Sequence, residues 1–329
     1  MPLVTLKNIR DDLASTVRDT QISSLLTSFI NTTGLEAHLF HPWTYLRRKQ
    51  TFATVASTED YTLDSEVDRI AVLRQITTPT RLIYLPDHVF YQYVVDPENQ
   101  GSGNPEIYRL WEETGFSTAL AADDTVYVSS SSASDTSAFT VRIVGRNSSG
   151  EVVSETLTLN GTSSVTSTTT WDAAGLMSIS KSASTTGTIT CYRTTGATVL
   201  SEMEPDNLAP RFKRISLYPI PSAVVTMYLE YYERYRYLIH DTDIPQMDSQ
   251  WTWVLREGAL AKAWEYKQNE QLFLAHRAIF QQGLLQMRSQ DERNVDYVPV
   301  LQPRSVVSSV VRRYADSVND NYPVYGVGY

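Results

Sequence analysis

Hydrophobic residues recur every three to four positions over residues 4–40, the spacing of one face of an α-helix. From Thr51 the period changes to two, over TFATVAS and YTLDSEVDRIAVLRQI, with the turn-prone STED between them. This pattern predicts two helices, then a β-hairpin that leads into a longer strand, and RLIYL as a further strand. The apolar helix positions are Leu6, Ile9, Leu13, Ile22, Leu25, Leu26, Phe29 and Ile30.

Between Thr125 and Thr195 the composition changes, because 32 residues are Ser or Thr and only eight are charged. FTVRIVG, VVSETLTLN and GLMSISKS alternate apolar with polar residues, with turns at NSSG and NGT. The segment is expected to form about seven short strands in an all-β sandwich inserted into another domain. The competing interpretation is a disordered Ser/Thr linker. The residues that offer a core are Phe139, Ile143, Leu157, Leu159, Trp171 and Ile179.

After Pro205 the pattern of the first part resumes. FKRISLYPIP and VVTMYLEYYERYRYLI predict two long strands, and the stretch from Trp251 to Arg293 predicts the longest helix. The last residues alternate proline and tyrosine with patches of valine and hold no steady period, so we expect an arm that buries its valines on a partner.

These changes of pattern divide the chain into four parts of an α+β protein. Residues 1–124 and 197–292 are the two parts of a host domain of helices and strands, residues 125–196 are the inserted β-sandwich, and residues 293–329 are the extended C-terminal arm. A chain of 329 residues is long enough for such a host domain with a large insertion.

Charge and cysteine content restrict the class of protein. The net charge of −9 argues against a protein that wraps nucleic acid through a basic face. No apolar run is long enough to span a bilayer and the N-terminus lacks a secretory layout, so we expect synthesis in a cytoplasm. The single cysteine, Cys191, excludes an internal disulfide and is interpreted as a packed small side chain.

Candidate chemistry is sparse. The phosphate-binding, hydrolase and CxxC signatures are absent, and we predict no catalytic residues, no metal site and no cofactor. Glu36, His38 and His41 could approach one another near a helix end, but a metal site needs three or four convergent ligands, so we assign none there. HDTD at 240–243 lacks the closely spaced oxygen ligands of a calcium loop and is interpreted as a solvated turn.

HPWTYLRRKQTF, from His41 to Phe52, gathers a histidine, cations and aromatic residues as an active site does. We interpret it as scaffolding, with the aromatic residues sealing the junction between the helices and the hairpin. Arg47, Arg48 and Lys49 are expected to end a short helix, where the carbonyl groups favour cations.

The order of two helices, then a W-x-Y-L-R-R segment and a Y-x-L strand, resembles the head-to-tail adaptor (connector) proteins of tailed double-stranded DNA bacteriophages. The chain departs at Asp64, where the family often has proline. The Ser/Thr-rich segment is similar to the immunoglobulin-like modules of phage structural proteins. The matching structural residues are Trp43, Tyr45, Leu46, Arg47, Arg48, Tyr61, Leu63, Asp68 and Arg69.

The resemblance implies a structural virion protein in the neck between head and tail, assembled in the host cytoplasm. It implies a homo-oligomeric ring, usually a dodecamer, that binds the portal protein on one side and tail, nozzle or stopper proteins, or tail fibres, on the other. Double-stranded DNA would pass through the ring without sequence-specific binding. We expect the C-terminal arm to bind the portal through Val306, Val307, Val310, Val311, Tyr314, Tyr322 and Tyr325.

Two other functions remain open from the sequence. The first is another neck or tail component, a stopper or a fibre-anchoring protein. The second is a carbohydrate-binding adhesin that uses Trp171 as a stacking surface. An enzyme is not expected, because the candidate acids and bases are scattered along the chain.

Overall fold

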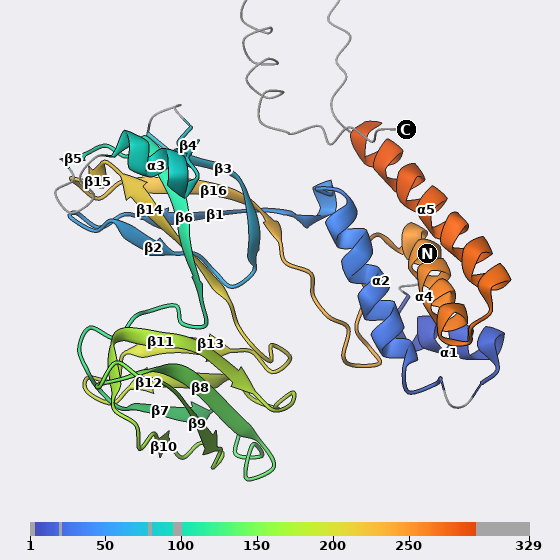
Figure 1. Ribbon diagram of the computed structural model, residues 1–329, viewed down its shortest axis with the longest axis horizontal. Coiled ribbons are helices and arrows are strands. Elements are labelled where there is room, and N and C mark those ends of the chain that lie inside the picture. The colour runs from blue at the N-terminus through green and yellow to red at the C-terminus, as the bar shows by residue number, and fades with distance from the viewer. Residues whose placement is uncertain (1–3, 20–21, 78–80, 95–100, 294–329) are drawn as a thin grey trace, which may run out of the picture. The chain divides into compact units, whose positions relative to one another are not determined.

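The computed structural model describes residues 4–19, 22–77, 81–94 and 101–293 (Figure 1). The chain divides into two compact units, residues 1–284 and 285–329. The described residues form both helices and several β-sheets, which confirms the predicted mixed α+β class. No helix within these ranges is long and apolar enough to cross a membrane.

Helices from both ends of the first unit pack together. α1 buries Leu6, Ile9 and Leu13 at the predicted spacing, and Thr5 and Asn8 close its first turn as a capping box. Gly258 makes room for close packing, since a Cβ there would lie 2.3 Å from Thr33 Cγ2. The helices are α1 (Leu6–Val17), α2 (Leu26–Phe40), α4 (Thr252–Tyr266) and α5 (Glu270–Arg293), the last of which continues into the second unit.

The single long helix expected from Trp251 to Arg293 is wrong, because the chain forms two helices there. Gln268 adopts a left-handed backbone with φ of 56° between α4 and α5. The Asn269 side chain then accepts a hydrogen bond from the Leu272 N–H at 3.2 Å, which satisfies a free donor at the start of α5. Apolar periodicity continues across this break, so it does not reveal the turn.

The first sheet has the strand order β1-β16-β3 (Figure 1). The predicted hairpin between TFATVAS and the following strand is wrong, because β1 and β3 do not pair with each other and both flank β16. Arg47 is the C-cap of a short 3-10 helix, and Arg48 Nη1 donates to the Tyr45 carbonyl oxygen of that helix at 2.9 Å, so the expected helix end is confirmed for these two cations. All three residues also begin β1, and Lys49 lies inside it. The strands are β1 (Arg47–Ala53), β3 (Val67–Gln75) and β16 (Thr226–Glu233), and a short 3-10 helix (Thr44–Leu46) precedes β1.

A second sheet of order β2-β14-β6-β4 shares a core with the first. Leu73 and Leu229 from the first sheet and Tyr108 and Ile215 from the second all lie in this core. The elements are β2 (Asp60–Thr62), β4 (Ile83–Tyr84), β6 (Ile107–Thr114) and β14 (Phe212–Tyr218), with α3 (Asp87–Tyr93) and a small pair, β5 (Ser102–Gly103) and β15 (Ile220–Pro221), nearby in sequence.

Two antiparallel sheets, β10-β7-β12-β13 and β11-β8-β9, share one apolar core in the Ser/Thr-rich region. Ile143, Leu157, Leu159, Trp171 and Ile179 are buried in that core, as predicted, and Phe139 packs against it. The regular pairing excludes the disordered-linker interpretation. The strands are β7 (Val126–Ser130), β8 (Thr140–Asn147), β9 (Val152–Thr158), β10 (Val165–Thr166), β11 (Trp171–Lys181), β12 (Ile189–Arg193) and β13 (Val199–Met203).

The chain enters the β-rich region from β6 and returns from it into β14, two neighbouring strands of the second sheet. Thr114, the last residue of β6, pairs with Phe212, the first residue of β14. The core of the region includes Phe116 and Leu120 on one side and Leu200 and Met203 on the other, outside the predicted boundaries of 125 and 196.

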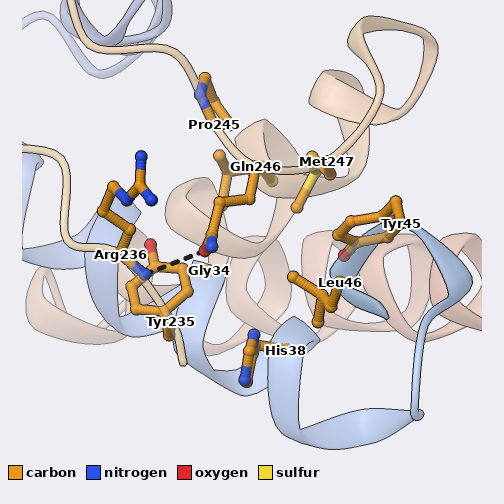
Figure 2. Close-up of a pocket in the computed structure, with 10 residues that line it drawn as sticks. Gly34, His38, Tyr45, Leu46, Tyr235, Arg236, Pro245, Gln246 and Met247 are labelled. Carbon is orange, nitrogen blue, oxygen red and sulfur yellow. Dashed lines mark hydrogen bonds between the residues drawn. The ribbon is translucent and has the colours of Figure 1, made fainter. Parts of the chain in front are cut away.

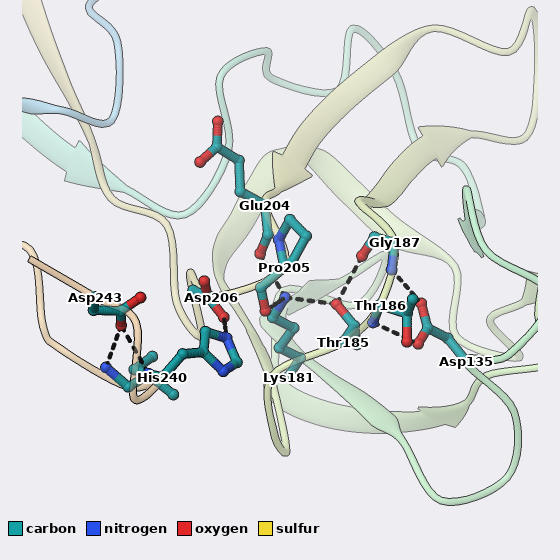
Figure 3. A network of polar contacts seen from close by, with 11 residues as sticks. Asp135, Lys181, Thr185, Thr186, Gly187, Glu204, Pro205, Asp206, His240 and Asp243 are labelled. Atoms are coloured by element: carbon teal, nitrogen blue, oxygen red, sulfur yellow. Dashed lines mark hydrogen bonds and ion pairs between the residues drawn. The ribbon is translucent and has the colours of Figure 1, made fainter. Parts of the chain in front are cut away.

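Polar contacts close the exit of the β-rich region (Figure 3). The buried Lys181 ammonium donates to Thr185 Oγ1 at 2.9 Å and to the carbonyl oxygens of Glu204 and Pro205 at 2.5 and 2.7 Å. Burial lowers the pKa of Lys181 to about 8. Asp206, the next residue, forms a 2.6 Å contact with His240 Nε2. These contacts connect β11, the exit segment and the loop that follows β16.

Candidate functional site at the helix–sheet junction

Trp43 anchors the W-x-Y-L-R-R segment between α2 and β1. Its indole Nε1 donates to the Ala37 carbonyl oxygen at 2.8 Å, and the side chain is buried. The ring stacks on Tyr45, with 5.9 Å between centroids, and Leu46 is buried beside the segment. A buried indole with a satisfied donor fixes the angle between a helix and a strand, which supports scaffolding.

The two arginines of the segment bind carboxylates on the neighbouring strand. Arg47 forms an ion pair with Glu230. Arg48 Nη2 lies 2.9 Å from an oxygen of Glu233, a residue that is only 4% exposed. Because Glu233 is buried, the pair with Arg48 keeps its charge compensated where β1 and β16 begin to pair.

Tyr61 and Leu63 hold the strand that follows. The single proton of the Tyr61 hydroxyl is shared between the carbonyl oxygens of Val55 and Thr58, at 3.0 and 2.9 Å, and the hydroxyl accepts from the Val55 N–H at 3.0 Å, which closes the turn after β1. Desolvation raises the pKa of Tyr61. Leu63 is buried in the core shared by the two sheets. Both matches are therefore structural.

Asp68 joins the helices to the sheets. Its carboxylate lies 4.0 Å from His38 Nε2 on α2 and 3.7 Å from Lys213 Nζ on β14. The nearby His38 imidazole, together with the positive charge of Lys213, lowers the pKa of Asp68. Arg69, the next residue, is exposed, and its guanidinium lies 5.0 Å from the centre of the Tyr232 ring.

A small cavity lies beside this junction (Figure 2). Gly34, His38, Leu46, Tyr235 and Met247 are among the residues that line it. Its volume of about 10 Å³ has room for about one water molecule and not for a substrate. Its size therefore fits a small gap in the packing between the helices and the sheets.

Tyr235 is a junction residue that the sequence did not single out. Its hydroxyl donates to Asn31 Oδ1 at 3.3 Å, and Asn31 also exchanges two hydrogen bonds with the Leu238 backbone. Burial raises the pKa of Tyr235. Residues 31 and 235 are 204 positions apart, so no local pattern could have indicated the contact.

The side chains that the sequence offered as metal ligands make other contacts in the structure. Glu36 binds Arg277 and Lys262, which lowers the pKa of Glu36. Asp243 accepts hydrogen bonds from the backbone N–H groups of Ile239 and His240, an arrangement typical of a turn. Within the described ranges there is no group of three or more ligating side chains that could hold a metal ion.

Cys191 lies in the core of the β-rich region, and burial raises the pKa of its thiol to about 12. Trp171 is 0% exposed and its Nε1 donates to Ser167 Oγ at 3.3 Å, so it cannot be the sugar-stacking surface of the adhesin alternative. The predicted portal-binding residues, Val306 to Tyr325, lie outside the described residues.

The family model described as SU10 adaptor protein matches residues 141–304. This match points to a phage adaptor family. It supports a structural component of the virion and offers no support for catalysis. No curated protein matches the chain.

The matched range and the motif segment are different parts of the chain. The match begins in β8 and includes β14, β16, α4 and α5, whereas Trp43 to Arg69 precede it. The two parts meet in space, because β1 pairs with β16 along its whole length and β3 pairs with β16 with two register shifts. The segment that contains the motif residues is therefore hydrogen-bonded to the part of the chain that the family model matches.

Proposed function

We propose that the chain assembles into a ring, usually of twelve copies, that joins the portal at the capsid vertex to the tail machinery and leaves a channel for DNA. The match to the SU10 adaptor family carries this proposal. The hydrogen-bonded and buried Trp43 at the helix–sheet junction agrees with a structural role for the motif segment.

A ring needs two complementary surfaces on each copy. The first part of α5 offers an exposed surface with little charge, since Leu272, Leu274 and Ile279 are 37%, 56% and 42% exposed. The basic side chains of this part already have partners, because His276 contacts Glu257 and Arg277 contacts Glu36. Depletion of charge is typical of the centre of protein interfaces, so we assign this surface to contacts between copies.

The decisive experiment measures the mass of the full-length protein by light scattering or mass photometry, alone and mixed with its portal. A ring in the mixture supports the proposal. A protein that stays monomeric with the portal refutes it and favours another neck or tail component. The adhesin alternative has lost its proposed sugar-stacking residue, because Trp171 is buried.

We also propose that the C-terminal arm, residues 293–329, binds the portal through its valine and tyrosine residues. Such a segment would exchange conformational entropy for buried apolar area when it binds. Deletion of residues 295–329 should abolish portal binding in a pull-down. Binding unchanged by the deletion would remove this part of the proposal while leaving ring formation to be tested by mass.

The β-rich region is proposed to be an inserted immunoglobulin-like module that faces away from the ring. The pairing of Thr114 with Phe212 supports an insertion, because both ends of the module meet within one strand pair. A variant with a short turn in place of residues 115–211 should still form the ring. Loss of the ring in a variant that keeps its helical circular dichroism would show that the module is an interface.

A further inference from the structure

The outer face of the β1-β16-β3 sheet presents cations around a central column of tyrosine and glutamate. Strand register places Arg47 beside Tyr232 and Arg69, and Lys49 beside Glu230 and Val72. The third row is Thr51, Tyr228 and Arg74. The opposite face is the buried one, since Leu73, Met227 and Leu229 alternate with these residues and lie in the core.

Three of the four cations have no carboxylate partner. Within the described part of the chain, no carboxylate lies within ion-pair distance of Lys49, Arg69 or Arg74. Arg74 lies over the Tyr228 ring, 4.8 Å from its centre, and Arg69 lies over the Tyr232 ring. Stacking holds each guanidinium at the sheet surface and leaves its N–H groups free to bind another acceptor.

The single acid of the face is already occupied. Glu230 accepts a hydrogen bond from the Tyr228 hydroxyl at 2.9 Å and pairs with Arg47. These contacts help to lower the pKa of Glu230, against the effect of its partial burial. The face therefore carries an excess of positive charge on a chain whose net charge is −9.

We propose that this face binds the phosphate backbone of duplex DNA without reading its sequence. Lys49, Arg69 and Arg74 would bind phosphate oxygens. The contact would hold the genome inside the ring, and this role rests on the proposed function. The binding itself requires only the sheet. The cations lie on the two edge strands, about 10 Å apart across β16, since neighbouring strands are about 4.8 Å apart.

DNA fits this face better than a second copy of the chain does. Duplex DNA carries about one charge per 1.7 Å of its axis, so any placement of the face against it meets several phosphates. A protein partner would have to present carboxylates in a matching arrangement. Arginine also suits a phosphate backbone, because its guanidinium donates hydrogen bonds to phosphate oxygens.

Fluorescence anisotropy with a labelled 30-base-pair duplex tests the proposal on the full-length protein. Three phosphate contacts predict a decrease in affinity of about 40-fold between 50 and 200 mM salt. The variant Lys49→Gln/Arg69→Gln/Arg74→Gln should bind at least 10-fold more weakly at 50 mM salt and show a nearly flat salt dependence. Lys49→Arg/Arg69→Lys/Arg74→Lys should keep most of the affinity, because it keeps the charges.

A matched control separates this face from the total charge. Lys7→Gln/Arg142→Gln/Arg211→Gln removes three exposed cations elsewhere and changes the net charge equally, from −9 to −12. Equal losses of DNA affinity in the two triple glutamine variants would refute the assignment to this face. Absence of DNA binding by the wild type at 50 mM salt would refute it too.

The mass of each variant with the portal distinguishes the two proposals. If the sheet variant keeps DNA affinity but no longer forms the ring, the face contacts another copy and the DNA proposal is wrong. If the wild type binds DNA through this face but forms no ring, the proposed function fails while the binding site stands.

Discussion

The substitution Gly34→Ala is expected to destabilise the helix–sheet junction, although alanine is the better helix former. Gly34 lies in α2 against the Tyr235 ring. A Cβ at residue 34 would be 2.1 Å from Tyr235 Oη and 2.8 Å from Cζ, distances that real Cβ atoms do not adopt. Tyr235 would have to move, and its hydrogen bond to Asn31 would be lost.

The expected magnitude follows from three contributions. Alanine in place of glycine inside a helix stabilises by about 1 kcal/mol. Overpacking a core site by one methyl group costs about 1–3 kcal/mol, and a lost hydrogen bond costs about 1 kcal/mol. The net effect is a loss of roughly 1–3 kcal/mol in the free energy of unfolding of this part of the chain.

Urea unfolding followed by circular dichroism measures the effect, with Gly101→Ala as the control, because a Cβ at Gly101 would meet nothing within 4 Å. In a Tyr235→Ala background the sign should reverse, and Gly34→Ala should stabilise by up to about 1 kcal/mol. The reasoning is refuted if Gly34→Ala alone is as stable as the wild type, or if its cost persists unchanged without the tyrosine ring.

Three further predictions concern the β-rich region. The Cys191 thiol, buried and with its pKa raised to about 12, should react with a thiol reagent only after unfolding; rapid native labelling, followed by absorbance, would contradict the described core. Hydrogen bonding from Thr195 and Arg193 lowers the pKa of Asp124 to about 2. The stability from Asp124 is therefore present above about pH 4 and lost as the pH falls towards 2, and Asp124→Asn should weaken this acid sensitivity in thermal melts. Lys181→Met should destabilise by about 1–2 kcal/mol in urea, because three lost hydrogen bonds outweigh the relief of desolvation; unchanged stability would show that the exit contacts contribute nothing.

Local patterns predicted the elements better than their pairing. The spacing of Leu6, Ile9 and Leu13 determines which face of α1 is buried, and alternation predicted Ile143 and Ile179 in the β core. The partners of the strands depend on contacts between distant residues. Arg47 pairs with Tyr232, 185 positions away, so adjacency in sequence wrongly favoured a hairpin with the next strand.

The residues of the candidate site also fall into two groups, those whose role the local sequence predicted and those whose role it did not. Trp43, Tyr45 and Leu46 act within their own segment, and their scaffolding role could be predicted from their aromatic and apolar character. Tyr235 was missed because its contact with Asn31 on α2 is made by the tertiary fold alone. The basic face of the sheet could not be predicted from the net charge either, because a sum over the chain does not show where the cations gather.

The pairing of Thr114 with Phe212 has a consequence for the order of folding. About 100 residues separate these partners, so their pairing from an unfolded chain closes a long loop. If the β-rich region folds first on its own core, the loop shortens to about 10 flexible residues, which lowers the closure cost by about 2 kcal/mol. The middle of the chain is therefore expected to fold before its two flanks, and the sheet that holds β1, β3 and β16 forms last, after both flanks have been synthesised.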